Sequence, residues 1–154
     1  MSLIQELMNQ AAVGGLFNAS AIKRFSPAEI REAIQALVAT EQTSLACALG
    51  DAGMSLYPES EDMLAINGLL AVMNQDWQLA VEFLEDLLTL QGSNTQPFTY
   101  VMLVRALRCN LDPVRAIQVV QQGLAAYPEQ LELTAEALSL EEYANTLETN
   151  GYTH

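Results

Sequence analysis

The chain has 154 residues and a net charge of −13, from 19 acidic and 6 basic residues, and it is 51% hydrophobic but only 6% aromatic. The apolar content excludes a disordered chain. The scarcity of lysine and arginine argues against nucleic acid and anionic membranes as partners, because both are bound through basic side chains. Alanine and leucine dominate instead, which favours closely packed helices, and this length predicts a single domain.

Residues 1–25 begin with a helical pattern and continue into a connector. Leu3, Ile4, Leu7 and Met8 recur at helical spacing within residues 1–12, before Gly14-Gly15 interrupts the pattern. We expect an N-terminal helix that either covers the first repeat or docks elsewhere.

The first helical hairpin is predicted over residues 27–60. Ser26, Pro27 and Glu29 form a helix start, with a capping box and a proline at the first helical position. A turn near residues 41–43 leads to a second helix, which Tyr57-Pro58 ends.

Two further hairpins are predicted over residues 61–94 and 97–130. Ser60 and Asp76 cap the two helices of the middle hairpin. Pro97 opens the third hairpin, and Asp112-Pro113 starts its second helix in the same way as Ser26-Pro27.

The last predicted element is a C-terminal capping helix over residues 131–148, either as one bent helix or as two short ones. We expect Leu131, Ala135 and Leu138 to face inward. The end of a stack of repeats also requires a polar outer face for solubility.

Three alanines mark an internal repeat. Ala46, Ala80 and Ala116 lie 34 and 36 residues apart, and the segment at residues 53–59 nearly copies that at 123–129. A period near 34 with small residues at fixed offsets is typical of stacked helical hairpins, which serve as binding scaffolds.

With these features the chain resembles the tetratricopeptide repeat (TPR) family. The middle unit matches the motif best, at Leu64, Gly68, Trp77, Ala80 and Leu84. The outer units depart from it, with Ile34 and Val104 at a position for small residues. The resemblance covers about two thirds of the chain and implies an all-α fold, an α-α superhelix of TPR-like hairpins with N- and C-terminal capping helices.

The resemblance also implies a groove lined by the first helix of each hairpin. Its residues carry over as Arg31, Gln35, Ala65, Leu69, Val72, Met73, Val101, Arg105 and Arg108. The centre of this groove is apolar and its far wall is basic. We therefore expect it to bind a protein or peptide segment, helical or extended, with apolar anchors and acidic residues.

Two alternatives stay open. In the first alternative, the arginines pair internally, with Asp62, Glu32 or Asp112, and Leu69 and Val72 belong to the core. In the second alternative, which concerns function, the chain is a structural subunit of a homodimer or a larger assembly and has no free groove.

A narrower similarity is to chaperones and accessory factors of bacterial type III secretion systems. It rests on size, acidity and the stretch at residues 64–80.

The sequence offers little for chemistry. The lone histidine, His154, leaves no Ser/His/Asp or Cys/His set, and the glycines form no phosphate-binding loop. Cys47 and Cys109 lack metal-ligand spacing and predict a reduced, cytoplasmic protein. No apolar run approaches the ~18 residues of a membrane span, and the N-terminus lacks the basic start of a secretory signal. We expect no enzyme activity, no cofactor, no metal and no membrane insertion.

Overall fold

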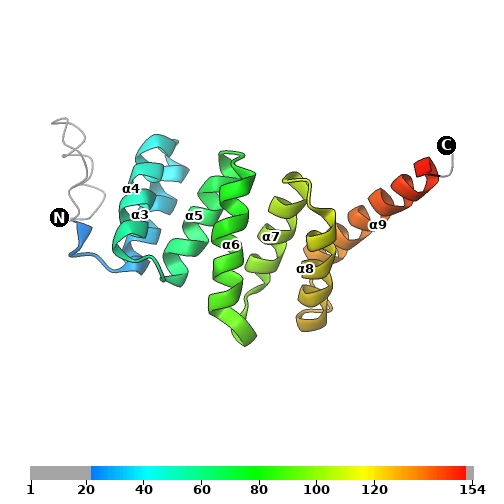
Figure 1. Cartoon of the computed structure of the whole chain (residues 1–154). Coiled ribbons are helices and arrows are strands. Elements are labelled where there is room, and N and C mark those ends of the chain that lie inside the picture. Colours follow the sequence, from blue (N-terminus) through cyan, green and yellow to red (C-terminus); the bar gives the residue numbers. More distant parts are fainter. Residues whose placement is uncertain (1–21, 152–154) are drawn as a thin grey trace. The chain divides into compact units, whose positions relative to one another are not determined.

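The computed structural model describes residues 22–151, and within this range the chain is helical with no strand (Figure 1). Its elements are α3 (Pro27–Ala39), α4 (Thr43–Leu56), α5 (Glu61–Met73), α6 (Trp77–Gln91), the 3-10 helix η1 (Gly92–Asn94), α7 (Pro97–Cys109), α8 (Pro113–Ala126) and α9 (Leu131–Gly151). The chain forms two compact units that divide between Leu70 and Ala71. The all-α prediction is confirmed, whereas the predicted helix at residues 1–12 lies outside the described residues.

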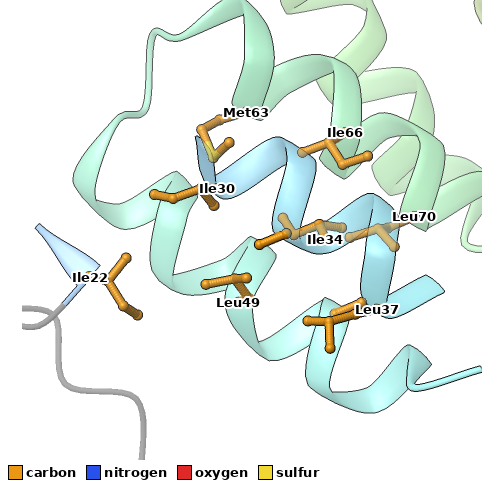
Figure 2. Close-up of a cluster of buried hydrophobic side chains, with 10 residues drawn as sticks. Ile22, Ile30, Ile34, Leu37, Leu49, Met63, Ile66 and Leu70 are labelled. Carbon is orange, nitrogen blue, oxygen red and sulfur yellow. The ribbon is translucent and has the colours of Figure 1, made fainter. Parts of the chain in front are cut away.

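The first unit packs α3 against α4 and closes its core with the first part of α5. Figure 2 shows buried side chains from these three helices meeting in one cluster, together with Ile22 from the segment before α3. The labelled members are Ile22, Ile30, Ile34, Leu37, Leu49, Met63, Ile66 and Leu70. The burial of Ile22, at 1% exposed, shows that the predicted connector contributes to the core.

Glycines in α4 let α5 approach its backbone. A Cβ at Gly53 would lie 2.6 Å from the Met63 sulfur, and one at Gly50 would lie 2.6 Å from Oδ1 of Asn67. Asn67 is buried, and its Nδ2 donates to the carbonyls of Met63 at 2.8 Å and Gly50 at 3.3 Å. Close packing, rather than backbone conformation, therefore favours the absence of a side chain at both positions.

In the second unit α7 is the central helix, because it contacts α6, α8 and α9. Ala80 in α6 and Ala116 in α8 are fully buried, as is Ala46 in the first unit, each at 0% exposed. Gly123 repeats the role of Gly53, since a Cβ there would lie 2.9 Å from Cδ1 of Leu133 and 3.0 Å from Cγ of Tyr100. These three alanines and the two glycines of the predicted repeat are therefore all buried.

The helix starts follow the predicted caps. The Ser26 hydroxyl accepts from the Glu29 amide at 3.2 Å while the Glu29 side chain accepts from the Ser26 amide at 3.0 Å. Asp76 and Asp112 accept from the amides three residues later, at 3.4 and 3.2 Å. These caps are confirmed. The predicted cap at Ser60 is confirmed as well, because its hydroxyl accepts from the Met63 amide at 3.3 Å.

The first helix of each hairpin ends in the same turn. Glu41, Gln75 and Leu111 adopt φ of 62°, 59° and 62°. The amide of the next residue donates back to the carbonyl five positions earlier, at 2.8 to 2.9 Å in all three turns. This is the Schellman arrangement, and here it is built without glycine.

Two tyrosines tie the ends of their own hairpins together. The Tyr57 hydroxyl donates to the carbonyl of Phe25 at 2.8 Å, and the Tyr127 hydroxyl donates to that of Thr95 at 2.7 Å. Both acceptors lie two residues before the proline that opens the hairpin. Each of these hydrogen bonds therefore lies within a single hairpin.

The C-terminal helix buries a different face from the one predicted, so the predicted rotation of this helix about its axis is wrong. Leu131, Ala135 and Leu138 are exposed, whereas Leu133, Glu136 and Leu140 are buried. Leu133 faces Gly123 and Tyr100, which sets the rotation of α9. The helix is continuous from Leu131, and its outer face is not wholly polar, because Leu131 is 82% and Leu138 57% exposed.

Candidate protein-binding site

The predicted groove residues fall in both units, and each set is described within its own unit. In the first unit Arg31 binds Asp62, with Nη1 3.1 Å from Oδ1, so that an ion pair joins α3 to α5. Gln35 is exposed, and Leu69 is half-buried against the core. Ala65 is only 5% exposed, which leaves Arg31, Gln35 and Leu69 as the accessible members.

In the second unit the apolar members lie on α5 and α7. Val72 is half-buried and Met73 is 46% exposed, whereas Val101 is buried at 4%. Arg105 and Arg108 keep 41% and 45% of their side chains exposed. The accessible members here are therefore Val72, Met73 and the two arginines.

Both arginines of α7 bind carboxylates of α9. Nε of Arg105 lies 3.1 Å from Oε1 of Glu136, and its Nη2 lies 3.2 Å from Oε2 of Glu132. Arg108 donates from Nη2 to Oε1 of Glu136 at 3.3 Å. Its Nε lies 3.1 Å from Oε2 of the same carboxylate, although the alignment falls short of a hydrogen bond. This set of four residues is called the α7–α9 ion cluster below.

The α7–α9 ion cluster removes most of the basic character expected at the far wall. Two guanidinium groups face two carboxylates, so their charges balance. Glu136 is 9% exposed, and a carboxylate at that depth requires such partners. Each arginine still has N–H donors left, because a guanidinium carries five. The arginines of the cluster can therefore donate hydrogen bonds to a further carboxylate.

Internal pairing was one of the two alternatives drawn from the sequence, and the structure bears it out for all three arginines. Arg31 pairs with Asp62, as that alternative named. Arg105 and Arg108 pair with Glu132 and Glu136, not with Glu32 or Asp112. The sequence reasoning missed these two glutamates. Their spacing of four on one helix was the signal available, since such residues share a helix face.

A hollow of about 300 Å³ lies beside Arg108. The turn between α7 and α8 and the middle of α9 form its walls. Its lining residues are Arg108, Leu111, Pro113, Ser139, Leu140 and Tyr143. Leu111 is 86% exposed and Tyr143 49% exposed, so this hollow combines apolar walls with one guanidinium and two hydroxyl-bearing side chains.

A fourth arginine has a structural role. Nε and Nη2 of Arg115 donate to the two oxygens of Glu85, both at 2.9 Å, and so join α8 to α6. This forked pair is the main cause that raises the pKa of Arg115, and burial opposes the rise. A raised arginine pKa favours the charged form, so the pair keeps its cation at all pH values below the ordinary arginine pKa.

The described part of the chain gives no sign of a metal centre. No group of three His, Cys, Asp or Glu side chains in that part is placed to hold an ion. Likewise, none of the helices in residues 22–151 has the length and apolar character to cross a membrane.

Comparison with known proteins identifies the fold. No family model and no curated protein matches the chain. A MamA mutant is 18% identical with a TM-score of 0.71, and the match covers 95% of this chain and 86% of that one. The MamA RS-1 ArsTM double mutant is 14% identical with a TM-score of 0.72, over 97% and 88%. Acl4, the assembly chaperone of RpL4, is 15% identical with a TM-score of 0.61, over 97% and 59%. The fold is therefore of the TPR type, built from helical hairpins.

Proposed function

We propose that the chain is a non-enzymatic protein-interaction module that binds a helical or extended segment of a partner through its first helices. The exposure of Met73 carries this proposal, because a methionine 46% exposed on a first helix is suited to an adaptable apolar contact. Gln35 and Leu69 in the first unit and Val72, Arg105 and Arg108 in the second supply the other accessible groups.

The expected partner segment has apolar anchors and at least one acidic residue. Within the second unit the anchors would meet Val72 and Met73, and Leu69 is the corresponding apolar group of the first unit. An acid would meet the remaining donors of Arg105 and Arg108, and hydrogen bonds between charged groups are about twice as strong as neutral ones. The name of Acl4, an assembly chaperone, supports a role in holding another protein. The narrower role of a secretion-system chaperone stays a prediction without support from the comparisons.

We place this activity in the cytoplasm. Cys47 and Cys109 are thiols rather than a disulfide, which agrees with a reducing compartment. Fractionation of the source cells tests this placement.

The function is tested by quantitative affinity purification from the source cells. Met73→Glu places a charge in the proposed groove, and Leu90→Glu is the matched control, because Leu90 is also 46% exposed but lies on the second helix α6. We expect Met73→Glu to reduce capture of the partner at least about tenfold and Leu90→Glu to leave it unchanged. Equal capture by both variants would exclude the groove.

Light scattering on the same proteins separates the alternative. If the chain forms a homo-oligomer that Met73→Glu dissociates, the apolar residues serve self-assembly and the chain is a structural subunit.

A further inference from the structure

Helix α9 exposes the face that α7 buries. In α7 four positions are at most 5% exposed: Tyr100, Leu103, Val104 and Leu107. The positions 34 residues later in α9 are Thr134, Ala137, Leu138 and Glu141, and all four are exposed or half-buried. In α7 these side chains are covered by the helices packed around it, whereas in α9 the same face is uncovered.

A groove runs beside this face. It is a hollow of about 330 Å³ between α8 and α9, and we call it the α8–α9 groove. Its apolar lining residues are Ile117, Val120, Leu124, Ala137, Leu140 and Ala144. The alanines on the α9 side allow a helix backbone to approach closely, as Ala46, Ala80 and Ala116 do inside the hairpins.

We propose that the α8–α9 groove binds one amphipathic helix of a partner protein, with small apolar residues on its contact face and basic residues along its flanks. The bound helix would cover α9 as α8 covers α7. This surface shares no residue with the groove of the proposed function, so either proposal can fail without the other.

The charge around the groove selects a basic helix. Among the lining residues that the structure describes, Glu141 is the only ionisable one, and Glu142 follows it directly in the sequence. Helix α9 contains no lysine or arginine, and among the described residues no basic side chain forms an ion pair with Glu141. The arginine of α8, Arg115, is held by Glu85. A lysine or arginine from the partner would therefore complete the charge balance.

The same charges argue against two other occupants. A second copy of α9 would bring carboxylates against carboxylates, and like charges in contact disfavour association. Residues 1–12 of a second copy contain Glu6 and no basic residue, so they lack the required flanks.

The test uses the full chain and two synthetic helical probes, with binding followed by fluorescence anisotropy. Both probes have the length of α8, 14 residues, and an alanine and leucine face. One carries lysines on both flanks of that face, and the other carries glutamates at the same positions. We expect the lysine probe to bind at least about fivefold more tightly.

A pair of neighbouring variants locates the binding. Glu141→Lys should reverse the preference between the probes, whereas Glu142→Lys makes the same change in net charge outside the lining and should keep the wild-type order. Circular dichroism checks that both variants remain folded. Equal affinity of the two probes, equal effects of the two variants, or no binding up to about 1 mM would overturn the proposal. A homodimer in sedimentation that Glu141→Lys dissociates would overturn it too, because the occupant would then be a second copy.

Discussion

Gly123 lies where α8 meets both α7 and α9, and Gly53 holds the corresponding place in the first unit. The two sites differ in what an added methyl group would meet. At Gly53 the nearest atom is the sulfur of Met63, the flexible end of a side chain. At Gly123 the Cβ and Cγ atoms of Tyr100 lie 3.1 and 3.0 Å away, and the Tyr100 ring is held edge-on by Tyr127 at a centroid distance of 6.2 Å.

We therefore expect Gly123→Ala to lower the free energy of unfolding by about 1–2 kcal/mol, the upper part of the range left by two opposing effects. The helix propensity of alanine favours the change by about 1 kcal/mol, but overpacking costs about 1–3 kcal/mol where neighbours cannot move. Gly53→Ala should be close to neutral, because Met63 can change rotamer. Urea unfolding measures both. A Gly123→Ala protein as stable as the wild type, or a larger loss for Gly53→Ala, would contradict this packing.

At the same scale the sequence predicts caps and small residues well, because each depends on neighbours within a few positions. Ser26, Asp76 and Asp112 cap as expected. The ion partners of Arg105 and Arg108 could not be predicted in this way. They come from a helix about 30 residues away, and which side of that helix faces α7 is decided by packing.

At the scale of elements, the first and third hairpins are closed by the same hydrogen bond. The tyrosine after the second helix donates to the carbonyl before the first, at 2.8 Å in one hairpin and 2.7 Å in the other. The middle hairpin has Gln91-Gly92 at the equivalent point and forms η1 there.

Removing either hydroxyl should weaken its own hairpin. We expect Tyr57→Phe and Tyr127→Phe each to cost about 1 kcal/mol, the usual net worth of one hydrogen bond. Tyr143→Phe, at an exposed tyrosine of α9, is the control and should cost nothing measurable. Thermal unfolding of the three variants provides the comparison. If Tyr57→Phe and Tyr127→Phe were as stable as the Tyr143→Phe control, these hydrogen bonds would not contribute to the stability of the hairpins.

The rotation of α9 shows where element-level prediction fails. Its pattern contains two apolar sets, Leu131 with Leu138 and Leu133 with Leu140, and periodicity alone does not rank them. Contact with Gly123 and the arginines of α7 selects the second set. The uncovered first set is then a consequence of tertiary packing rather than of the local sequence.

At the scale of the whole molecule, the chain carries a net charge of −13. Arg31, Arg105, Arg108 and Arg115 are each held by a carboxylate, so at least four of the six basic residues form ion pairs within the chain. The electrostatic field around the protein is therefore negative. It favours cationic partners and predicts that binding in the α8–α9 groove weakens as salt is added.

The repeat itself was predictable from three alanines, because a fixed spacing of small residues reports on helix contacts that recur in each hairpin. Ala46, Ala80 and Ala116 are all at 0% exposed, which confirms their predicted burial. Which partner the hairpins hold was not predictable, since many functions share this fold.

The most direct test of a repeat built on small buried residues is to enlarge them. Ala46→Leu and Ala116→Leu should each lower the free energy of unfolding by about 1–3 kcal/mol in urea denaturation, because the added atoms have no space. The exposed alanines Ala39→Leu and Ala125→Leu are matched controls in α3 and α8 and should change stability by less than about 0.5 kcal/mol. If the buried and exposed substitutions proved equally harmless, the helices would not pack through these alanines, and the account of the fold would be wrong.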